Sequence, residues 1–305
     1  MEPSVVILPE PSPYLIEAVR AGGCVVEPLS ATTRGLVLTA GMSQDALETV
    51  LDVHPDLAWI QLPLAGVDQY QDLMGRNPGR QWTSGKGAFG QPVGEFALAL
   101  ILALLRSVAT FARAQTWGAP QGTSLHNKRV VIVGAGGVGG EILRLVSAFT
   151  EHITVVRAHN VPVPGAEKTV TDEGLDEALR DADVLVLAAP MTSGTEHLMD
   201  ARRLALLRPE AFLVNVARGP LVETAALAGA LAAGKLAGAA LDVTDPQPLP
   251  DGHPLWSESR ALVTPHTGET AEMIRPLFAR RVERNVRNLG AGLPLEGLVD
   301  VRAGY

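Results

Sequence analysis

The 305-residue sequence lacks several features by which whole classes of protein are identified. Cys24 is its one cysteine, so neither an internal disulfide nor a cysteine-based metal site can form, and we predict no metal centre. Long hydrophobic runs are also missing, because the most apolar stretch, residues 96–105, ends at Arg106 and is too short to span a bilayer. Positive charge is in deficit: the net charge of −8 gives no support to binding of nucleic acid or anionic membranes.

The N-terminus lacks the marks of a secretory signal. It reads MEPSVVILPEPSP, without the basic segment and the longer apolar segment of a signal peptide. We therefore expect a cytoplasmic protein. The length is typical of two domains, and 47% hydrophobic with 19% charged residues is typical of globular proteins.

What the chain does have is an alternation of short apolar runs and helical patterns. Strands buried on both faces read as continuous Val, Ile and Leu, and helices form the crossovers between parallel strands. The alternation therefore predicts a doubly wound α/β fold. The predicted strands are Ser4–Leu8, 36–39, 58–61, 129–133, Ile153–Val156, 184–188, Phe212–Asn215, Gly238–Leu241 and Ala261–Val263, and predicted helices include 11–21, 43–50, 139–149 and 224–233.

A long helical pattern from Val93 to about Trp117 marks the best domain border. Loops rich in glycine and proline are predicted on both sides, at 82–92 and 118–127. The pattern at 275–289 predicts a final amphipathic helix that can fold back onto the first domain. Its polar face, which we interpret as exposed to solvent, carries Arg280, Arg281, Arg284 and Arg287.

The segment RVVIVGAGGVGG (129–140) places three glycines between a strand and a helix. Gly134 allows the tight turn, Gly136 lets the backbone approach a pyrophosphate, and Gly139 lets helix and strand pack closely. The helix N-terminus offers free N–H groups to the phosphates. This order of strand, glycines and helix predicts a dinucleotide site.

The residue at the end of the next strand suggests which dinucleotide is bound. An acidic residue there would bind the ribose hydroxyls of NAD, but this chain has Arg157 and no Asp or Glu close by. An arginine can receive the 2′-phosphate of NADP through charge-assisted hydrogen bonds. We therefore expect NADP(H) to be favoured over NAD(H).

Three further segments carry polar residues just past apolar strands. They contain Arg218, the pair Asp242 and Gln247, and His266. Ligands of open α/β sheets bind beyond the carboxyl ends of the strands, so these residues are expected to converge on the nicotinamide end of the coenzyme.

With these segments the chain resembles the D-isomer-specific 2-hydroxyacid dehydrogenase family. The matching pieces, in order, are LAGVD (64–68), PVGEFAL (92–98), VGAGGVGG, NVARG (215–219), LDVTDPQPLP with HPLW, and TPHTG (264–268). The resemblance implies two doubly wound parallel-sheet domains. A Rossmann NAD(P)-binding domain (94–271) would be inserted into a flavodoxin-like substrate domain (1–93 and 272–305). It also implies a homodimer, in which the stretch 96–105 is either interface or core.

The resemblance assigns roles where residues match. Arg218 would bind the substrate and polarise its carbonyl, His266 would be the general acid/base, and Asp242 would hold the nicotinamide carboxamide. Backbone N–H groups around Ala65 and Gly66 would bind the substrate carboxylate. The implied coenzyme contacts are Gly134, Gly136, Gly137, Val138, Gly139, Arg157, Ala189, Pro190, Thr195, Ala217 and Asp242. Glyoxylate and hydroxypyruvate are the first candidate substrates; 3-phosphoglycerate is a further one.

The chain departs from the family at one catalytic position. Most members pair the histidine with a glutamate, and here that position is Gln247. An amide can orient the imidazole but supplies no negative charge to favour its protonated form. A histidine–glutamine pair is also found in the related formate dehydrogenases, although the short N-terminus and the lack of an asparagine ahead of the VGEF segment fit that group less well. Phe96, where a histidine is usual, is a second small departure. A non-catalytic, dinucleotide-sensing binding protein is the third hypothesis, and the intact Arg218 and His266 argue against it.

Overall fold

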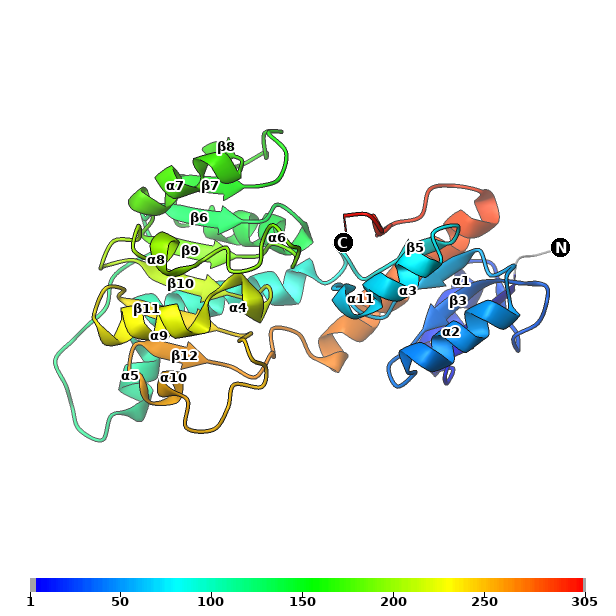
Figure 1. Cartoon of the computed structure of the whole chain (residues 1–305), viewed down its shortest axis with the longest axis horizontal. Coiled ribbons are helices and arrows are strands. Elements are labelled where there is room, and N and C mark those ends of the chain that lie inside the picture. Colours follow the sequence, from blue (N-terminus) through cyan, green and yellow to red (C-terminus); the bar gives the residue numbers. More distant parts are fainter. Residues whose placement is uncertain (1–3, 304–305) are drawn as a thin grey trace. The chain divides into compact units, whose positions relative to one another are not determined.

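The computed structural model describes residues 4–303 and divides the chain into two compact units (Figure 1). Unit 1 comprises Met1–Phe89 and Thr270–Tyr305, and unit 2 comprises Gly90–Glu269. The sequence predicted domain borders at 93 and 271, and residues 1–3 and 304–305 of the predicted substrate domain lie outside the described residues. Each unit contains its own parallel sheet, which confirms the predicted fold class.

Unit 1 is built on a five-stranded sheet with the order β2-β1-β3-β4-β5. All its neighbouring strands pair in parallel. This is the flavodoxin-like order, in which the chain starts in the middle of the sheet and winds outward in both directions. The strands are β1 (Ser4–Leu8), β2 (Val25–Val26), β3 (Thr33–Leu38), β4 (Trp59–Gln61) and β5 (Gln81–Thr83).

Successive side chains of a strand point to opposite faces of the sheet, so apolar strands need helices on both faces to cover them. Val5 and Ile7 of β1 belong to one core cluster, and Val6 between them belongs to another. The first cluster lies under α1 (Pro13–Ala21) and α11 (Ala271–Ala291), which pack against each other. The second cluster lies under α2 (Gln44–Val53) and α3 (Gln71–Arg76). The 3₁₀ turn η1 (Asp68–Tyr70) directly precedes α3. The last helix thus returns to the first unit, as expected.

Unit 2 is built on a seven-stranded sheet with the order β12-β11-β10-β9-β6-β7-β8, again all parallel. Counted from β6, this is the Rossmann order with one added strand, and β6 lies between β7 and β9 at the switch point. The strands are β6 (Val130–Val133), β7 (Ile153–Val156), β8 (Lys168–Val170), β9 (Val184–Leu187), β10 (Phe212–Asn215), β11 (Gly238–Leu241) and β12 (Ala261–Val263).

Two helical layers enclose this second sheet. Val130 and Ile132 pack beneath α4 and α6, whereas Val131 and Val133 face the layer of α7 and α9. The helices are α4 (Gly90–Leu105), α5 (Val108–Arg113), α6 (Gly137–Val146), α7 (Leu175–Asp181), α8 (Ala201–Leu204), α9 (Thr224–Ala232) and α10 (Pro254–Ser257), with 3₁₀ turns η2 (Asp172–Gly174) and η3 (Gly219–Leu221).

Two local predictions were wrong. The pattern from Val93 to Trp117 is not one helix, because the chain breaks after α4 at Ser107, whose φ is +52°. There the carbonyl of Leu105 accepts a hydrogen bond from Thr123 N at 2.7 Å, so the chain returns instead of continuing as a helix. The predicted loop 82–92 also contains the end of β5 and the start of α4.

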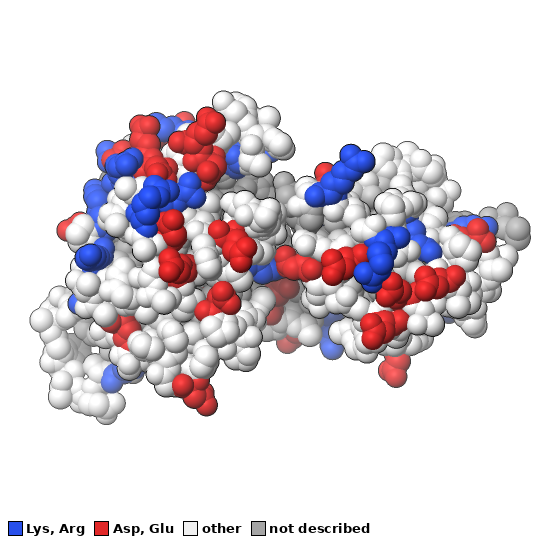
Figure 2. Space-filling view, in the orientation of Figure 1, with Lys and Arg blue, Asp and Glu red and all other residues white. Residues whose placement is uncertain are grey.

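Among residues 4–303, no helix combines the length and apolar character needed to cross a membrane. On the face shown in Figure 2, the acidic and basic side chains of the described residues are interspersed.

Candidate active site

The turn between β6 and α6 can form only with glycine at two positions. Gly134 has a φ of +113°, and a Cβ on it would lie 2.5 Å from the carbonyl oxygen of Ala188. A Cβ on Gly139 would lie 1.9 Å from the carbonyl oxygen of Gly134. Gly134 N also donates to Val156 O at 2.8 Å, which ties the turn to β7. These glycines therefore fix the shape of the turn.

Gly136 has a different environment. It is the exposed N-cap residue of α6, and a Cβ on it would meet no atom within 4 Å. The first helical residues, Gly137 and Val138, follow directly and present the unpaired N–H groups of a helix N-terminus. An open turn before a helix N-terminus is the arrangement that accepts a pyrophosphate, so these residues fit a dinucleotide.

Two further candidate segments follow the strands on either side of β6: Arg157 follows β7, and a loop follows β9. Arg157 follows β7 directly, is half-buried, and donates from Nη1 to Val161 O at 3.3 Å. After β9, Ala189 is buried, and Thr195 Oγ1 donates to Pro190 O at 2.8 Å, which closes the loop. The predicted coenzyme contacts after β6, β7 and β9 thus follow three adjacent strands of one sheet.

Arg218 is presented by a turn that Asn215 organises. The fully buried Asn215 side chain accepts from Ala217 N at 3.0 Å and donates to Arg218 O at 2.9 Å. A Cβ on Gly219 would lie 1.9 Å from Thr244 O, so this turn packs closely against the chain that follows β11. The close packing brings the Arg218 turn and the segment after Asp242 together.

Asp242 holds the turn that carries His266. Its buried carboxylate accepts three hydrogen bonds: from Thr264 Oγ1 at 2.7 Å, Thr267 N at 2.8 Å and Gly268 N at 2.9 Å. His266 N donates to Asp242 O at 2.9 Å, and His266 itself has a φ of +52°. An uncommon backbone conformation of this kind persists where the surrounding contacts determine it.

The His266 ring pairs with Gln247 and is exposed, so a small molecule can reach it. Gln247 Nε2 lies 2.8 Å from His266 Nδ1. With the amide nitrogen facing the ring, Nε2–H donates to Nδ1 of a neutral imidazole, whose proton then sits on its own Nε2. Turning the amide by 180° would let its oxygen accept from Nδ1–H of an imidazolium. The one side chain can therefore orient both protonation states.

Glu269 is a further candidate site residue, which the sequence motifs did not predict. It is half-buried, and burial raises the pKa of its carboxyl; the charge of Arg218 opposes this rise and that of Asp242 adds to it. The electrostatic coupling places Glu269 in the same group of charges as the two predicted residues. The signal that could have found it is its position directly after TPHTG.

The predicted carboxylate-binding residues, Ala65 and Gly66, lie in unit 1, in the loop that follows β4. Leu62 N donates to Thr83 O at 2.7 Å, and Gly85 N donates to Leu64 O at 2.8 Å. The first part of the loop, up to Leu64, is thus tied to β5 and the turn after it. Unit 2 brings together the glycine turn, Arg218, Asp242, Gln247 and His266.

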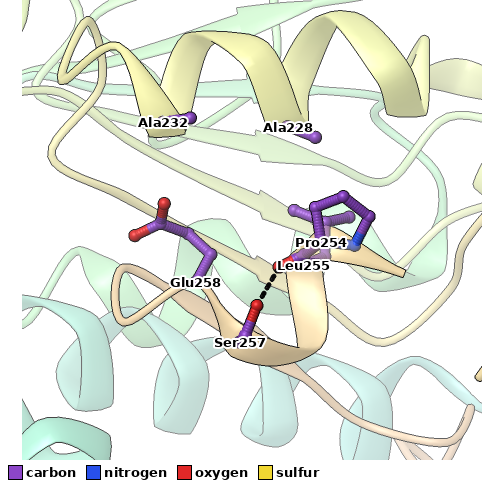
Figure 3. A pocket seen from close by; sticks show the side chains of 6 residues that line it. All are labelled: Ala228, Ala232, Pro254, Leu255, Ser257 and Glu258. Carbon is purple, nitrogen blue, oxygen red and sulfur yellow. Dashed lines mark hydrogen bonds between the residues drawn. The ribbon is translucent and has the colours of Figure 1, made fainter. Parts of the chain in front are cut away.

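A separate small pocket lies on unit 2 between α9 and α10 (Figure 3), and none of the predicted site residues lines it. Apart from Ser257 and Glu258 its lining side chains are apolar, and Ser257 Oγ already donates to Pro254 O at 3.1 Å. The pocket therefore offers few groups for a polar substrate.

Comparisons with known proteins show which family the chain resembles. The family model described as D-isomer specific 2-hydroxyacid dehydrogenase, NAD binding domain, matches residues 98–268. An uncharacterized protein of the proB 3′ region of Corynebacterium melassecola is 38% identical over 260 residues, which are 83% of this chain and 86% of that protein. The glyoxylate reductase of Thermofilum pendens is 32% identical over 249 residues, 78% of this chain and 73% of that enzyme.

A solved structure shares the whole fold. The D-isomer specific 2-hydroxyacid dehydrogenase from Xanthobacter autotrophicus Py2, solved in complex with NADPH and MES, matches with a TM-score of 0.85 and 28% identity over 100% of both chains.

The open space at Gly136 leads to a prediction. In Gly136→Ala the added methyl group meets no protein atom, so the melting temperature should stay unchanged. The methyl group would, however, block the approach of the pyrophosphate, and the dissociation constant of the coenzyme should rise by about tenfold or more. Gly140→Ala is the matched control, since its Cβ also meets nothing within 4 Å. Coenzyme titration by fluorescence measures both, and unchanged affinity in Gly136→Ala would contradict the assignment.

Proposed function

The chain belongs to the D-isomer specific 2-hydroxyacid dehydrogenase family, and from this premise we propose that His266 and Arg218 interconvert a small 2-oxo acid and its D-2-hydroxy acid. As a member of this family it is an NAD(P)-dependent oxidoreductase of 2-hydroxy acids. The observation that carries the assigned roles is the Asp242-held turn, which presents the exposed His266 ring after β12. The Arg218 turn follows β10, two strands away in the same sheet.

The residues divide the chemistry between them. The nicotinamide coenzyme supplies the hydride for reduction and accepts it in oxidation. His266 donates a proton to the oxo oxygen during reduction and removes it from the hydroxyl group in the reverse direction. Arg218 binds the substrate and polarises its carbonyl with a fixed guanidinium. Backbone N–H groups at Ala65 and Gly66 bind the substrate carboxylate.

Further roles concern the coenzyme. Gly134, Gly136 and Gly139 shape the phosphate-binding turn, and Asp242, besides holding the His266 turn, binds the carboxamide. Arg157 binds the 2′-phosphate, so that NADP(H) is favoured over NAD(H). The absence of an acidic residue in the RAHN segment (157–160) supports this preference, as does the NADPH bound in the similar Xanthobacter structure.

The substrate is a short 2-oxo acid, with glyoxylate and hydroxypyruvate as the first candidates. A single arginine and a backbone cradle suit one carboxylate beside the reacting carbonyl. The similarity to a glyoxylate reductase supports the same choice. Neither the formate dehydrogenase-like reaction nor a non-catalytic sensor has better support.

A test of this function is the oxidation of NADPH and NADH with glyoxylate, hydroxypyruvate, pyruvate and longer 2-oxo acids. We expect turnover with the shortest acids and a lower KM for NADPH than for NADH. Replacement of His266 by alanine should lower kcat by about 10²–10⁴-fold, the usual contribution of a general acid. A chain that binds coenzyme but reduces none of the acids would contradict the proposal, and formate would then be assayed. A lower KM for NADH would overturn the coenzyme preference.

The Gln247 amide leads to a second prediction, on pH dependence. In Gln247→Glu a carboxylate would face His266 Nδ1 at the position of the amide, and its charge would favour the protonated imidazole. The protonated ring is the proton donor for reduction, so the alkaline limb of the pH–rate profile should move upward by about one pH unit. Gln247→Ala is the control: it should lower kcat without the upward move. If the alkaline limb of the pH–rate profile does not move in Gln247→Glu, the hydrogen bond between residue 247 and His266 does not control proton donation.

We propose in addition that the protein is a homodimer, formed through α5 and the segment 114–124. The helix stretch 96–105, considered above for this role, packs its apolar side chains into the core of unit 2. By contrast, residues 110–124 are all exposed, among them Phe111 of α5 and Trp117. Val108 of α5 is exposed as well. A second copy of the chain would remove these apolar side chains from water.

The dimer is tested by sedimentation of Trp117→Ala. We expect the wild-type chain to sediment as a dimer and the variant to dissociate at low micromolar concentration, because the aromatic side chain is a typical interface anchor. Trp256→Ala is the matched control, since Trp256 is a half-exposed tryptophan of the same unit. Monomeric wild-type protein, or equal behaviour of both variants, would contradict this interface.

A further inference from the structure

Arg281 departs from the expectation that the arginines of the last helix face solvent. Its relative exposure is only 4%, whereas Arg280 and Arg287 of the same helix are exposed. A buried guanidinium is costly unless it is paired and hydrogen-bonded, and burial lowers its pKa. Such a group is expected where its hydrogen bonds have a specific purpose.

The guanidinium of Arg281 binds two backbone carbonyls of one short turn. Nη1 donates to Ser84 O at 2.7 Å, and Nη2 donates to Lys86 O at 3.0 Å. The third nitrogen, Nε, lies 3.4 Å from Glu296, which balances the charge without forming a hydrogen bond. The planar fork of an arginine can reach two carbonyls at fixed spacing, which a lysine ammonium cannot reproduce.

The clamped turn holds the loop that follows β4. Residue 85 lies between the two clamped carbonyls, and Gly85 N donates to Leu64 O at 2.8 Å. Leu64 directly precedes Ala65 and Gly66, the proposed carboxylate-binding residues. An unbroken series of hydrogen bonds thus leads from Arg281 through residues 84–86 to this loop.

A second buried side chain of α11 holds the strand end from which this loop departs. Asn285, one helical turn after Arg281, has 0% exposure and donates to Gln61 Oε1 at 2.9 Å. Gln61 Nε2 in turn donates to Leu62 O at 2.9 Å. Asn285 therefore fixes the end of β4, and Arg281 fixes the turn after β5.

We propose that Arg281 is a positioning residue for substrate binding: by clamping the turn 84–86 it holds the 64–66 loop in the conformation that receives the substrate carboxylate. This inference rests on the proposed role of Ala65 and Gly66. Arg281 does not touch the substrate. Because the carboxylate is bound equally in the ground state and the transition state, a displaced loop weakens substrate binding without slowing the bound reaction.

The informative variant is Arg281→Lys. It keeps the charge beside Glu296 but cannot bind both carbonyls, whereas Arg281→Ala would leave the buried Ser84 carbonyl and the partly buried Lys86 carbonyl without this partner and is expected to impair folding. In Arg281→Lys the KM for the oxo acid should rise by about tenfold, with kcat changed by less than about twofold. The dissociation constant of NADPH should not change. Arg287→Lys is the control, since Arg287 pairs with Glu283 on the exposed side of the same helix.

A second measurement does not depend on activity. Hydrogen–deuterium exchange of backbone amides should increase in Arg281→Lys within peptides that cover residues 62–68 and 84–88, and remain unchanged in Arg287→Lys. An unchanged KM, whether or not exchange increases, would overturn the proposal. So would a joint fall in melting temperature, coenzyme affinity and kcat, which indicates a general structural role.

Failure of the proposed function can be distinguished from failure of the inference about Arg281. Wild-type protein without turnover on 2-oxo acids would refute the proposed function and with it the use of the loop for a carboxylate. The exchange measurement would still decide whether Arg281 holds the loop.

Discussion

The parallel arrangement of the strands is the constraint on which the site depends. All strands of a parallel sheet end at the same edge, so residues that follow them are brought together however far apart they lie in the sequence. In unit 2, six strands are followed by a candidate site residue. The candidate site residues that directly or closely follow a strand are Gly134 after β6, Arg157 after β7, Ala189 after β9, Arg218 after β10, Asp242 after β11 and His266 after β12. In unit 1, Ala65 and Gly66 follow β4 in the same way.

This constraint explains how much could be predicted from the sequence. Buried parallel strands need apolar side chains on both faces, so the central strands were visible as runs of Val, Ile and Leu. The strands β2 and β8 were missed because they are short edge strands with exposed or half-buried residues, and β5 was assigned to a loop. The break at Ser107 was also missed, since it depends on the return of Thr123 to Leu105, a contact that a local pattern does not contain.

The same distinction between local patterns and contacts in the folded chain applies to the candidate site. Glycines and polar residues at strand ends are local signals, and they made Gly134, Arg218 and His266 candidates from the sequence alone. Helical periodicity assigned Arg281 to a polar face, but it says nothing of what that face meets. Residues 84–86, which cover it, lie on a distant part of the chain, and residues 296–297 lie beyond the end of the helix. Burial of an arginine is therefore a property of the tertiary structure, and only the structure could reveal it.

The discontinuity of unit 1 has a consequence for synthesis on the ribosome. The strands of unit 1 emerge first, but α11, which covers Val5, Ile7 and Trp59 on one face of their sheet, follows only after unit 2 has been made. At about 5–20 residues per second, the roughly 180 intervening residues take about 10–40 s. During that interval α1 is the helix available to cover this face, and the part that α11 covers in the finished structure stays open. Domains generally fold as units during synthesis, so the nascent chain would complete unit 2, which matches the NAD binding domain of the family, before unit 1.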